Sequence, residues 1–235
     1  MNCLILFDKD MVDIAHARLA GVRIEHAFER LPTTIGQVLT VGLLNGNLGT
    51  GTIAAINPES IDLDISLDKK PPAPSSITLI CALPRPKSMR KVVHAAVTLG
   101  IKKIILLETW NVDKGYWQTP WLFPDYLYNL SIIALEQAVD TIMPSIELKK
   151  KFKPFVEDEL PQLIGQSLCF IAHPHSGAIC PSDIRESVTL AIGPEGGFND
   201  YELGKFEGLG FARITLGQRQ LRVEEAVAAI VGRLL

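Results

Sequence analysis

The sequence of 235 residues has no apolar run that approaches the roughly 20 residues a membrane-spanning helix needs. Its first ten residues, MNCLILFDKD, reach the acidic Asp8 before the apolar core of a signal peptide can develop. Because both features of membrane or export targeting are missing, we expect a cytoplasmic protein without a membrane partner.

Cysteine is scarce, and its spacing does not fit a metal site. The four cysteines are Cys3, Cys81, Cys169 and Cys180, and no two of them form a CxxC pair. No histidine cluster has the spacing of a zinc site either. Since each cysteine adjoins apolar residues, we expect reduced core thiols and no bound metal.

The chain also lacks the excess of positive charge that marks many nucleic-acid-binding proteins. It has 23 basic and 26 acidic residues, and the net charge of −3 falls within residues 1–74. Two basic clusters nevertheless follow, Arg85–Lys91 and Lys149–Lys153. Charge runs of this size are usually solvated faces, so they leave a nucleic-acid partner open.

A proline-rich stretch at residues 68–76, DKKPPAPSS, excludes a helix or a central strand and predicts a domain linker. Before it, residues 38–44, 51–56 and the alternating residues 60–67 have the pattern of β-strands, with a short helix near 23–30. Several short strands in about 70 residues are typical of a small antiparallel barrel.

After the linker, predicted strands and helices alternate, which indicates an α/β fold with a largely parallel sheet. The expected strands are residues 77–83, 103–107, 168–172, 188–192 and 212–216, and the expected helices are 86–99, 124–139, 199–208 and 223–235. Gly100 is expected to cap the first of these helices.

Two loops at predicted strand ends stand out. GPEGGF at 193–198 places three glycines between a strand and a helix, where the backbone can approach a ligand closely. It is neither a phosphate loop nor a dinucleotide fingerprint, because GxxxxGK[ST] and GxGxxG are both absent. The second loop, LGQRQLRVEEA at 216–226, brings two arginines and two glutamates to a helix start. Taken singly, either loop is about as often a plain connection or a surface ion-pair cluster as a functional site.

Together, GPEGGF and LGxRxLRxEEA resemble the C-terminal signature of the RsmE family, S-adenosylmethionine-dependent enzymes that methylate N3 of a uridine in small-subunit 16S ribosomal RNA. Residues 82–107 and 135–148 resemble further parts of the family. The segments GYWQTP, LEQAVDT and FKPFVEDELP resemble a divergent subgroup. The likeness extends over nearly the whole chain.

The resemblance implies a PUA-like β-barrel at residues 1–70, which would bind RNA, and a SPOUT methyltransferase domain with a C-terminal trefoil knot at 71–235. It also implies a homodimer whose partner is ribosomal RNA or the assembled small subunit. The cofactor contacts it implies are Ala172, His173, Ile192, Gly193, Gly196, Gly197, Leu216, Gly217, Leu221 and Arg222. His173 by itself would more often be a bystander than a catalyst.

For the chemistry, a cation beside the uridine carbonyl oxygens would stabilise the anion that forms when the N3 proton leaves. Arg222, and secondarily Arg219, are the candidates, while Glu224 would orient Arg222 or act as a base.

The chain departs from the family at Ala95, at Glu108-Thr109-Trp110-Asn111 and at Ala138-Val139-Asp140. Two alternatives therefore stay open: a methyltransferase for a different RNA site, and an RNA-binding homologue without catalysis.

Aromatic residues are concentrated in one segment. All three tryptophans and three of the four tyrosines lie within residues 110–128. Such rings can stack on unpaired bases, but a dimer interface or the core of a loop is the interpretation that the sequence favours.

Overall fold

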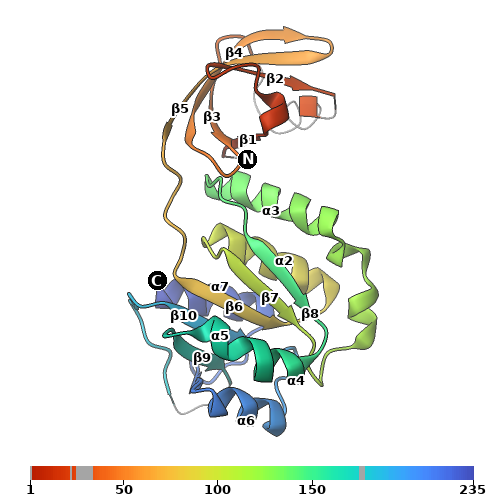
Figure 1. Cartoon of the computed structure of the whole chain (residues 1–235), viewed down its shortest axis with the longest axis vertical. Coiled ribbons are helices and arrows are strands. Elements are labelled where there is room, and N and C mark those ends of the chain that lie inside the picture. The colour runs from red at the N-terminus through yellow and green to blue at the C-terminus, as the bar shows by residue number, and fades with distance from the viewer. Residues whose placement is uncertain (1, 22, 25–33, 175–177) are drawn as a thin grey trace. The chain divides into compact units, whose positions relative to one another are not determined.

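The computed structural model describes residues 2–21, 23–24, 34–174 and 178–235 (Figure 1). The chain divides into two compact units: unit 1 comprises Met1–Ala73 and Ile132–Met143, and unit 2 comprises Pro74–Ser131 and Pro144–Leu235. This division differs from the predicted boundary near residue 70, which places Ile132–Met143 in the second domain. An apolar helix face does not reveal which core it packs on, and here Ile132 packs on Cys3, Ile5 and Leu48 of unit 1.

Unit 1 is built on a five-stranded sheet in the order β1-β3-β4-β5-β2. Its strands are β1 (Leu4–Leu6), β2 (His16–Ala20), β3 (Val38–Leu43), β4 (Leu48–Asn57) and β5 (Ser60–Lys69), and a 3₁₀ turn covers Asp8–Asp10. The alternation predicted for residues 60–67 is confirmed, since Ile61, Leu63 and Ile65 enter the core.

The expectation of a purely antiparallel arrangement in unit 1 is wrong, because β1 pairs with β3 in parallel. A three-residue apolar run is too short to show a strand pattern in the sequence. The linker also begins later than predicted, since β5 continues through Lys69. The helix expected near 23–30 lies outside the described residues apart from Arg23 and Ile24.

Unit 2 contains a six-stranded sheet in the order β11-β9-β10-β6-β7-β8, and every pair of neighbours is parallel. The strands are β6 (Ile77–Ala82), β7 (Lys103–Leu107), β8 (Ser145–Lys149), β9 (Leu168–Ala172), β10 (Val188–Ile192) and β11 (Ala212–Ile214). The predicted α/β fold with a parallel sheet is therefore confirmed. Sequence analysis missed β8, an edge strand whose charged Glu147 and Lys149 break the apolar pattern.

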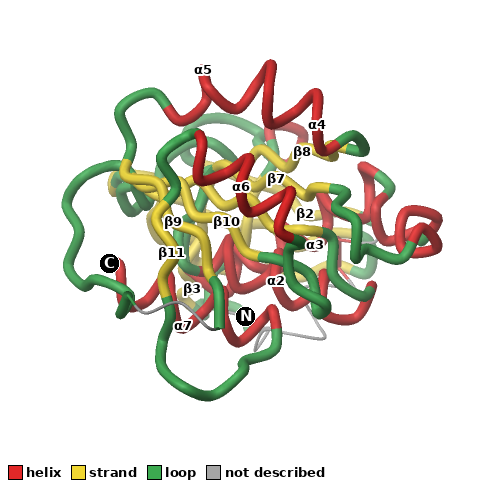
Figure 2. Tube along the Cα trace, turned by 90° about the horizontal axis from the view of Figure 1, so that it is seen from below, coloured by secondary structure: helices red, strands yellow, loops and turns green. Residues whose placement is uncertain are grey.

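Helices cover both faces of this sheet, with α2 and α7 on one side and α4, α5 and α6 on the other (Figure 2). The covering helices are α2 (Pro86–Thr98), α4 (Phe152–Pro154), α5 (Leu160–Ile164), α6 (Asp200–Gly208) and α7 (Val223–Leu234). Helix α3 (Pro124–Ala138) begins in unit 2, and its second half belongs to unit 1. Shorter elements are the 3₁₀ turns Lys114–Gln118 and Pro120–Leu122 and the π-helical turn Phe155–Glu159. Covering both faces explains why β10 is buried at all five positions and is apolar at four of them.

Candidate functional site

Three strands of unit 2 end at the same level of the sheet. Ala172 at the end of β9 lies opposite both Ile192 at the end of β10 and Ile214 at the end of β11. The segments that begin at His173, Gly193 and Thr215 therefore leave from one edge, the carboxyl edge at which parallel sheets bind ligands. We call residues 193–199 the glycine loop and residues 215–222 the arginine loop.

The predicted ligand-binding residues are all found at this edge. Ala172 ends β9 and His173 follows it, while Ile192 ends β10 and Gly193, Gly196 and Gly197 lie in the glycine loop. The arginine loop contains Leu216, Gly217, Leu221 and Arg222. The fold thus brings together residues up to 50 positions apart in the sequence.

The glycine loop needs its glycines for conformation and for space. Gly197 has a φ of +71°, which side chains rarely tolerate, and its amide donates to the carbonyl of Pro194 at 2.8 Å. A Cβ on Gly193 would lie 3.1 Å from the Phe198 ring, and one on Gly196 would lie 3.1 Å from Cβ of Asn111. A side chain at either position would have to displace a neighbour.

A side chain from the loop after β7 holds the glycine loop from outside. Nδ2 of Asn111 donates to the carbonyl oxygens of Gly196, at 3.2 Å, and Gly197, at 3.0 Å. Sequence analysis noted Asn111 only as a departure from the family, because a contact across 85 residues has no local signal.

Glu202 fixes the other end of the glycine loop. Its amide donates to Oδ1 of Asn199 at 2.9 Å, and its Oε2 accepts the Asn199 amide at 3.0 Å, a reciprocal cap of α6. Its Oε1 accepts the Trp110 amide at 2.7 Å, and the residue is 3% exposed. Sequence analysis missed Glu202, although the N-x-x-E pattern at 199–202 is a capping signal.

The arginine loop is far less constrained. Gly217 has a φ of +127°, and its amide donates to Oγ1 of Thr215 at 3.2 Å. Leu216, Arg219, Leu221 and Arg222 are all exposed. The amide of Arg222 donates to Oε2 of Glu225 at 3.2 Å and so caps α7.

Glu224 faces helix α2 and does not pair with an arginine in the described part of the chain. Its carboxylate is 11% exposed, and Oε1 lies 3.3 Å from Nζ of Lys91. Burial raises the pKa of Glu224, but its own backbone amide, Ser88 and Lys91 outweigh burial and leave the pKa below its usual value. The residue is therefore an anion with a cationic partner on another helix.

The carboxyl edge has the features that a nucleoside-containing cofactor requires. The amides of Gly193 and Gly196 have no hydrogen-bond partner within the described ranges, so they are free to bind polar atoms. Leu216 and Leu221 offer exposed apolar surface to a base. These features, with the crowded glycines, fit S-adenosylmethionine, the cofactor that the sequence resemblance implies.

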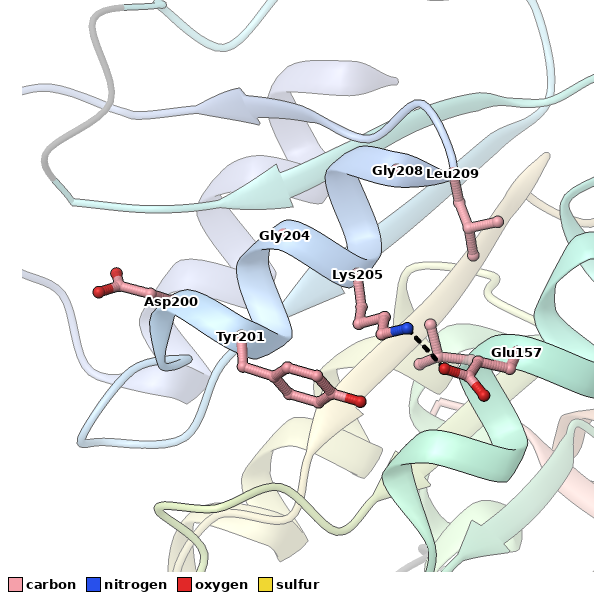
Figure 3. A pocket seen from close by; sticks show the side chains of 8 residues that line it. Glu157, Asp200, Tyr201, Gly204, Lys205, Gly208 and Leu209 are labelled. Atoms are coloured by element: carbon pink, nitrogen blue, oxygen red, sulfur yellow. Dashed lines mark hydrogen bonds and ion pairs between the residues drawn. The ribbon is translucent and has the colours of Figure 1, made fainter.

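A hollow of about 510 Å³ lies beside α6, where Nζ of Lys205 pairs with Oε1 of Glu157 at 2.6 Å (Figure 3).

The described residues contain no group of three or more His, Cys, Asp or Glu side chains placed to hold a metal ion. They also contain no helix long and apolar enough to cross a membrane.

The fold and the glycine-rich carboxyl edge define a parallel α/β domain with a candidate ligand site at one edge of its sheet. Residues 71–235 match the model of the RNA methyltransferase domain, so the chain belongs to that family.

Named relatives make the match more specific. The chain is 25% identical over 233 residues to the ribosomal RNA small subunit methyltransferase E of Treponema pallidum (strain Nichols), covering 96% of this chain and 88% of that one. The protein of the same name from Mesomycoplasma hyopneumoniae (strain 232) is 26% identical over 65% of this chain and 66% of its own. These matches confirm the resemblance to the RsmE family.

Solved structures agree on the fold along the whole chain. The methyltransferase E of Neisseria gonorrhoeae, bound to S-adenosylmethionine, superposes with a TM-score of 0.75 at 19% identity, covering 98% of this chain and 95% of that one. A Legionella pneumophila protein in complex with the same cofactor also gives 0.75, at 22% identity with coverages of 98% and 96%.

Proposed function

We propose that the protein is an S-adenosylmethionine-dependent ribosomal RNA methyltransferase that methylates N3 of a uridine in small-subunit 16S RNA. The observation that carries this proposal is the register of β9, β10 and β11, which presents the glycine and arginine loops at one edge of a domain of the RNA methyltransferase family. The names of the Treponema and Mesomycoplasma relatives support the choice of small-subunit RNA.

In this proposal the two loops and the end of β9 bind the cofactor. The amides of Gly193 and Gly196 donate to its polar atoms, and Leu216 and Leu221 cover its base. Ala172, His173, Ile192, Gly197, Gly217 and Arg222 complete the set of cofactor contacts. When bound, S-adenosylmethionine supplies an electrophilic methyl group at this edge.

Arg222 is proposed as the residue that stabilises the uridine anion formed when the N3 proton passes to solvent water. Its side chain is exposed at the end of the arginine loop, while its amide is used in the cap of α7. Arg219 lies in the same loop and adds positive charge. Because Glu224 is paired with Lys91 and has a lowered pKa, we assign it to fixing the start of α7 against α2 instead of accepting the proton.

Several finer features belong to the same proposal. A trefoil knot in unit 2 is supported by the strand order, in which β11 lies beyond β9, and by the bridge that Ile179 forms with Thr215. The five-stranded sheet of unit 1 supports a PUA-like RNA-binding domain near residues 1–70. The family resemblance supports a cytoplasmic homodimer that acts on ribosomal RNA or the small subunit.

The first test is calorimetric titration with S-adenosylhomocysteine. Wild type is expected to bind, and Gly197→Ala to bind more weakly, because a non-glycine residue at positive φ costs roughly 1–2 kcal/mol and shifts the loop. Gly210→Ala is the matched control: Gly210 also has a positive φ and open space, but it precedes β11 at the opposite edge of the sheet. Equal binding by Gly197→Ala and Gly210→Ala would remove the glycine loop from the cofactor site.

The substrate is tested by methyl transfer to unmodified small subunits in competition with bulk transfer RNA. Preferential labelling of the small subunit at a uridine supports the proposal. Labelling of transfer RNA instead would support a methyltransferase for a different RNA site, which the altered residues Ala95, Trp110 and Asp140 favour. Cofactor-independent RNA binding without transfer would indicate a homologue that has lost catalysis.

A further inference from the structure

The loop after β7 presents Trp110 to solvent beside the glycine loop. Trp110 is 82% exposed, whereas its flanking residues Thr109 and Val112 are buried. The amide of Val112 donates to the carbonyl of Thr109 at 3.1 Å, which closes a turn with Trp110 and Asn111 at its tip. A large aromatic ring is therefore held in water by a turn whose ends are anchored in the core.

The backbone under this ring is fixed to the candidate site. The Trp110 amide is bound by the buried carboxylate of Glu202, and the next residue, Asn111, donates to both Gly196 and Gly197. A tryptophan on a fixed backbone has only two side-chain torsions to restrict, so it loses little entropy when a ligand covers it.

Three other rings of this segment, those of Trp117, Trp121 and Tyr126, have close ring or cation partners. Nζ of Lys150 lies 5.7 Å from the ring centre of Trp117, the Arg90 guanidinium lies 4.9 Å from that of Trp121, and Trp121 stacks on Tyr126 at 6.1 Å. No such ring partner covers Trp110 within the described residues. These three rings are half-buried, so a loop-core interpretation fits them better than it fits Trp110.

Positive charge lies next to this turn. The amide of Glu108 donates to the carbonyl of Lys149 at 2.8 Å, so the loop after β7 starts beside the basic cluster Lys149–Lys153. Lys150 and Lys151 are exposed. Exposed rings interleaved with lysine fit single-stranded nucleic acid, which offers stacking bases and phosphates, better than a second protein copy, because protein interfaces are depleted of lysine.

We propose that Trp110 is a substrate-contacting residue that stacks on an unpaired base of the RNA next to the methyl-transfer site. This inference rests on the proposed function, whose RNA substrate it uses, and it assigns to Trp110 a role in RNA affinity and not in cofactor binding. The base leaves its own stack and gains the indole face in exchange.

The test measures retention of unmodified small-subunit RNA by filter binding, with S-adenosylhomocysteine affinity measured in parallel. Trp110→Ala is expected to raise the RNA dissociation constant about tenfold, since base–aromatic stacking is lost. Trp110→Phe should recover most of the affinity, and cofactor affinity should not change in either variant. Phe123→Ala is the matched control, because Phe123 is a 62% exposed ring in the same segment.

A spectroscopic signature distinguishes stacking from a structural role. The chain has three tryptophans, so Trp117→Phe combined with Trp121→Phe leaves Trp110 as the sole tryptophan. RNA is expected to quench its fluorescence. Unchanged RNA affinity in Trp110→Ala, no retention of RNA by wild type, or a change of oligomeric state with RNA affinity retained would each overturn the inference, the last by showing that the ring contacts a second copy.

Different results would contradict the proposed function and the role of Trp110. If wild type binds RNA through Trp110 but transfers no methyl group, the proposed function fails, while the contact of Trp110 with RNA stands. If wild type methylates RNA and Trp110→Ala has the same KM and RNA affinity, the proposed function stands and the inference fails.

Discussion

The glycine loop and the arginine loop leave the same sheet edge on either side of the end of β9, yet they are built in opposite ways. The glycine loop is held by Asn111 from one side and by the Asn199–Glu202 cap from the other. The arginine loop is exposed at Leu216 and from Gln218 to Arg222. Its hydrogen bonds lie at its two ends, where Thr215 bonds to Ala178, Cys180 and Gly217, and Arg222 bonds to Glu225.

This difference matches two separate tasks. A preformed loop with fixed amides binds a cofactor with little loss of backbone conformational entropy. An exposed loop with two long cationic side chains can adjust around a substrate that arrives later. We therefore expect substitutions in the glycine loop to affect cofactor binding and stability. In the arginine loop, we expect substitution of Arg219 or Arg222 to affect turnover, while Leu216 and Leu221 contribute to cofactor binding.

The largest expected effect is on turnover in the arginine loop. Arg222→Ala should lower kcat by about 10²–10³-fold, the usual loss when one group that stabilises a developing anion is removed. Arg219→Ala in the same loop is the matched control and should lower kcat less. Single-turnover methyl transfer at saturating cofactor measures both, and a wild-type rate in Arg222→Ala would exclude that residue from the chemistry.

The next largest expected effect is a loss of unfolding free energy, which differs between the two capping glutamates. Glu202→Ala leaves the partly buried amides of Trp110 and Asn199 without their acceptor, which should cost about 1–3 kcal/mol of unfolding free energy. Glu225→Ala removes a single exposed cap at the start of α7 and should cost about 1 kcal/mol or less. Urea unfolding measures both, and equal costs would mean that the glycine loop is no more firmly fixed than the arginine loop.

The smallest effect concerns pH. The folded pKa of Glu224 lies below its usual value of 4.5, so the unfolded chain binds more protons near that pH. The stabilisation by Glu224 is therefore present above about pH 4.5 and is lost as pH falls through the lower folded pKa. Glu224→Gln should reduce the difference in unfolding free energy between pH 7 and pH 4, measured by urea titration; an unchanged pH dependence would show that the Lys91 pairing contributes nothing.

Local sequence patterns predicted much of this architecture. Apolar runs such as residues 188–192 and the turn at Gly100 indicated the parallel sheet and the end of α2, because burial on both faces and a positive φ leave local signatures. The short β1, the charged edge strand β8 and the assignment of Ile132–Met143 to unit 1 did not follow, because each depends on a partner far away in the sequence.

For the candidate site, the sequence by itself determined which residues are available: the glycines of 193–197, the arginines at 219 and 222, and the family to which they belong. Only the tertiary structure decided their relations. It placed Asn111 against Gly196 and Gly197, turned Glu224 toward Lys91, and left Trp110 in water. The physical reason is that strand register brings distant loops to one edge, and contacts there depend on three-dimensional packing, which sequence spacing does not encode.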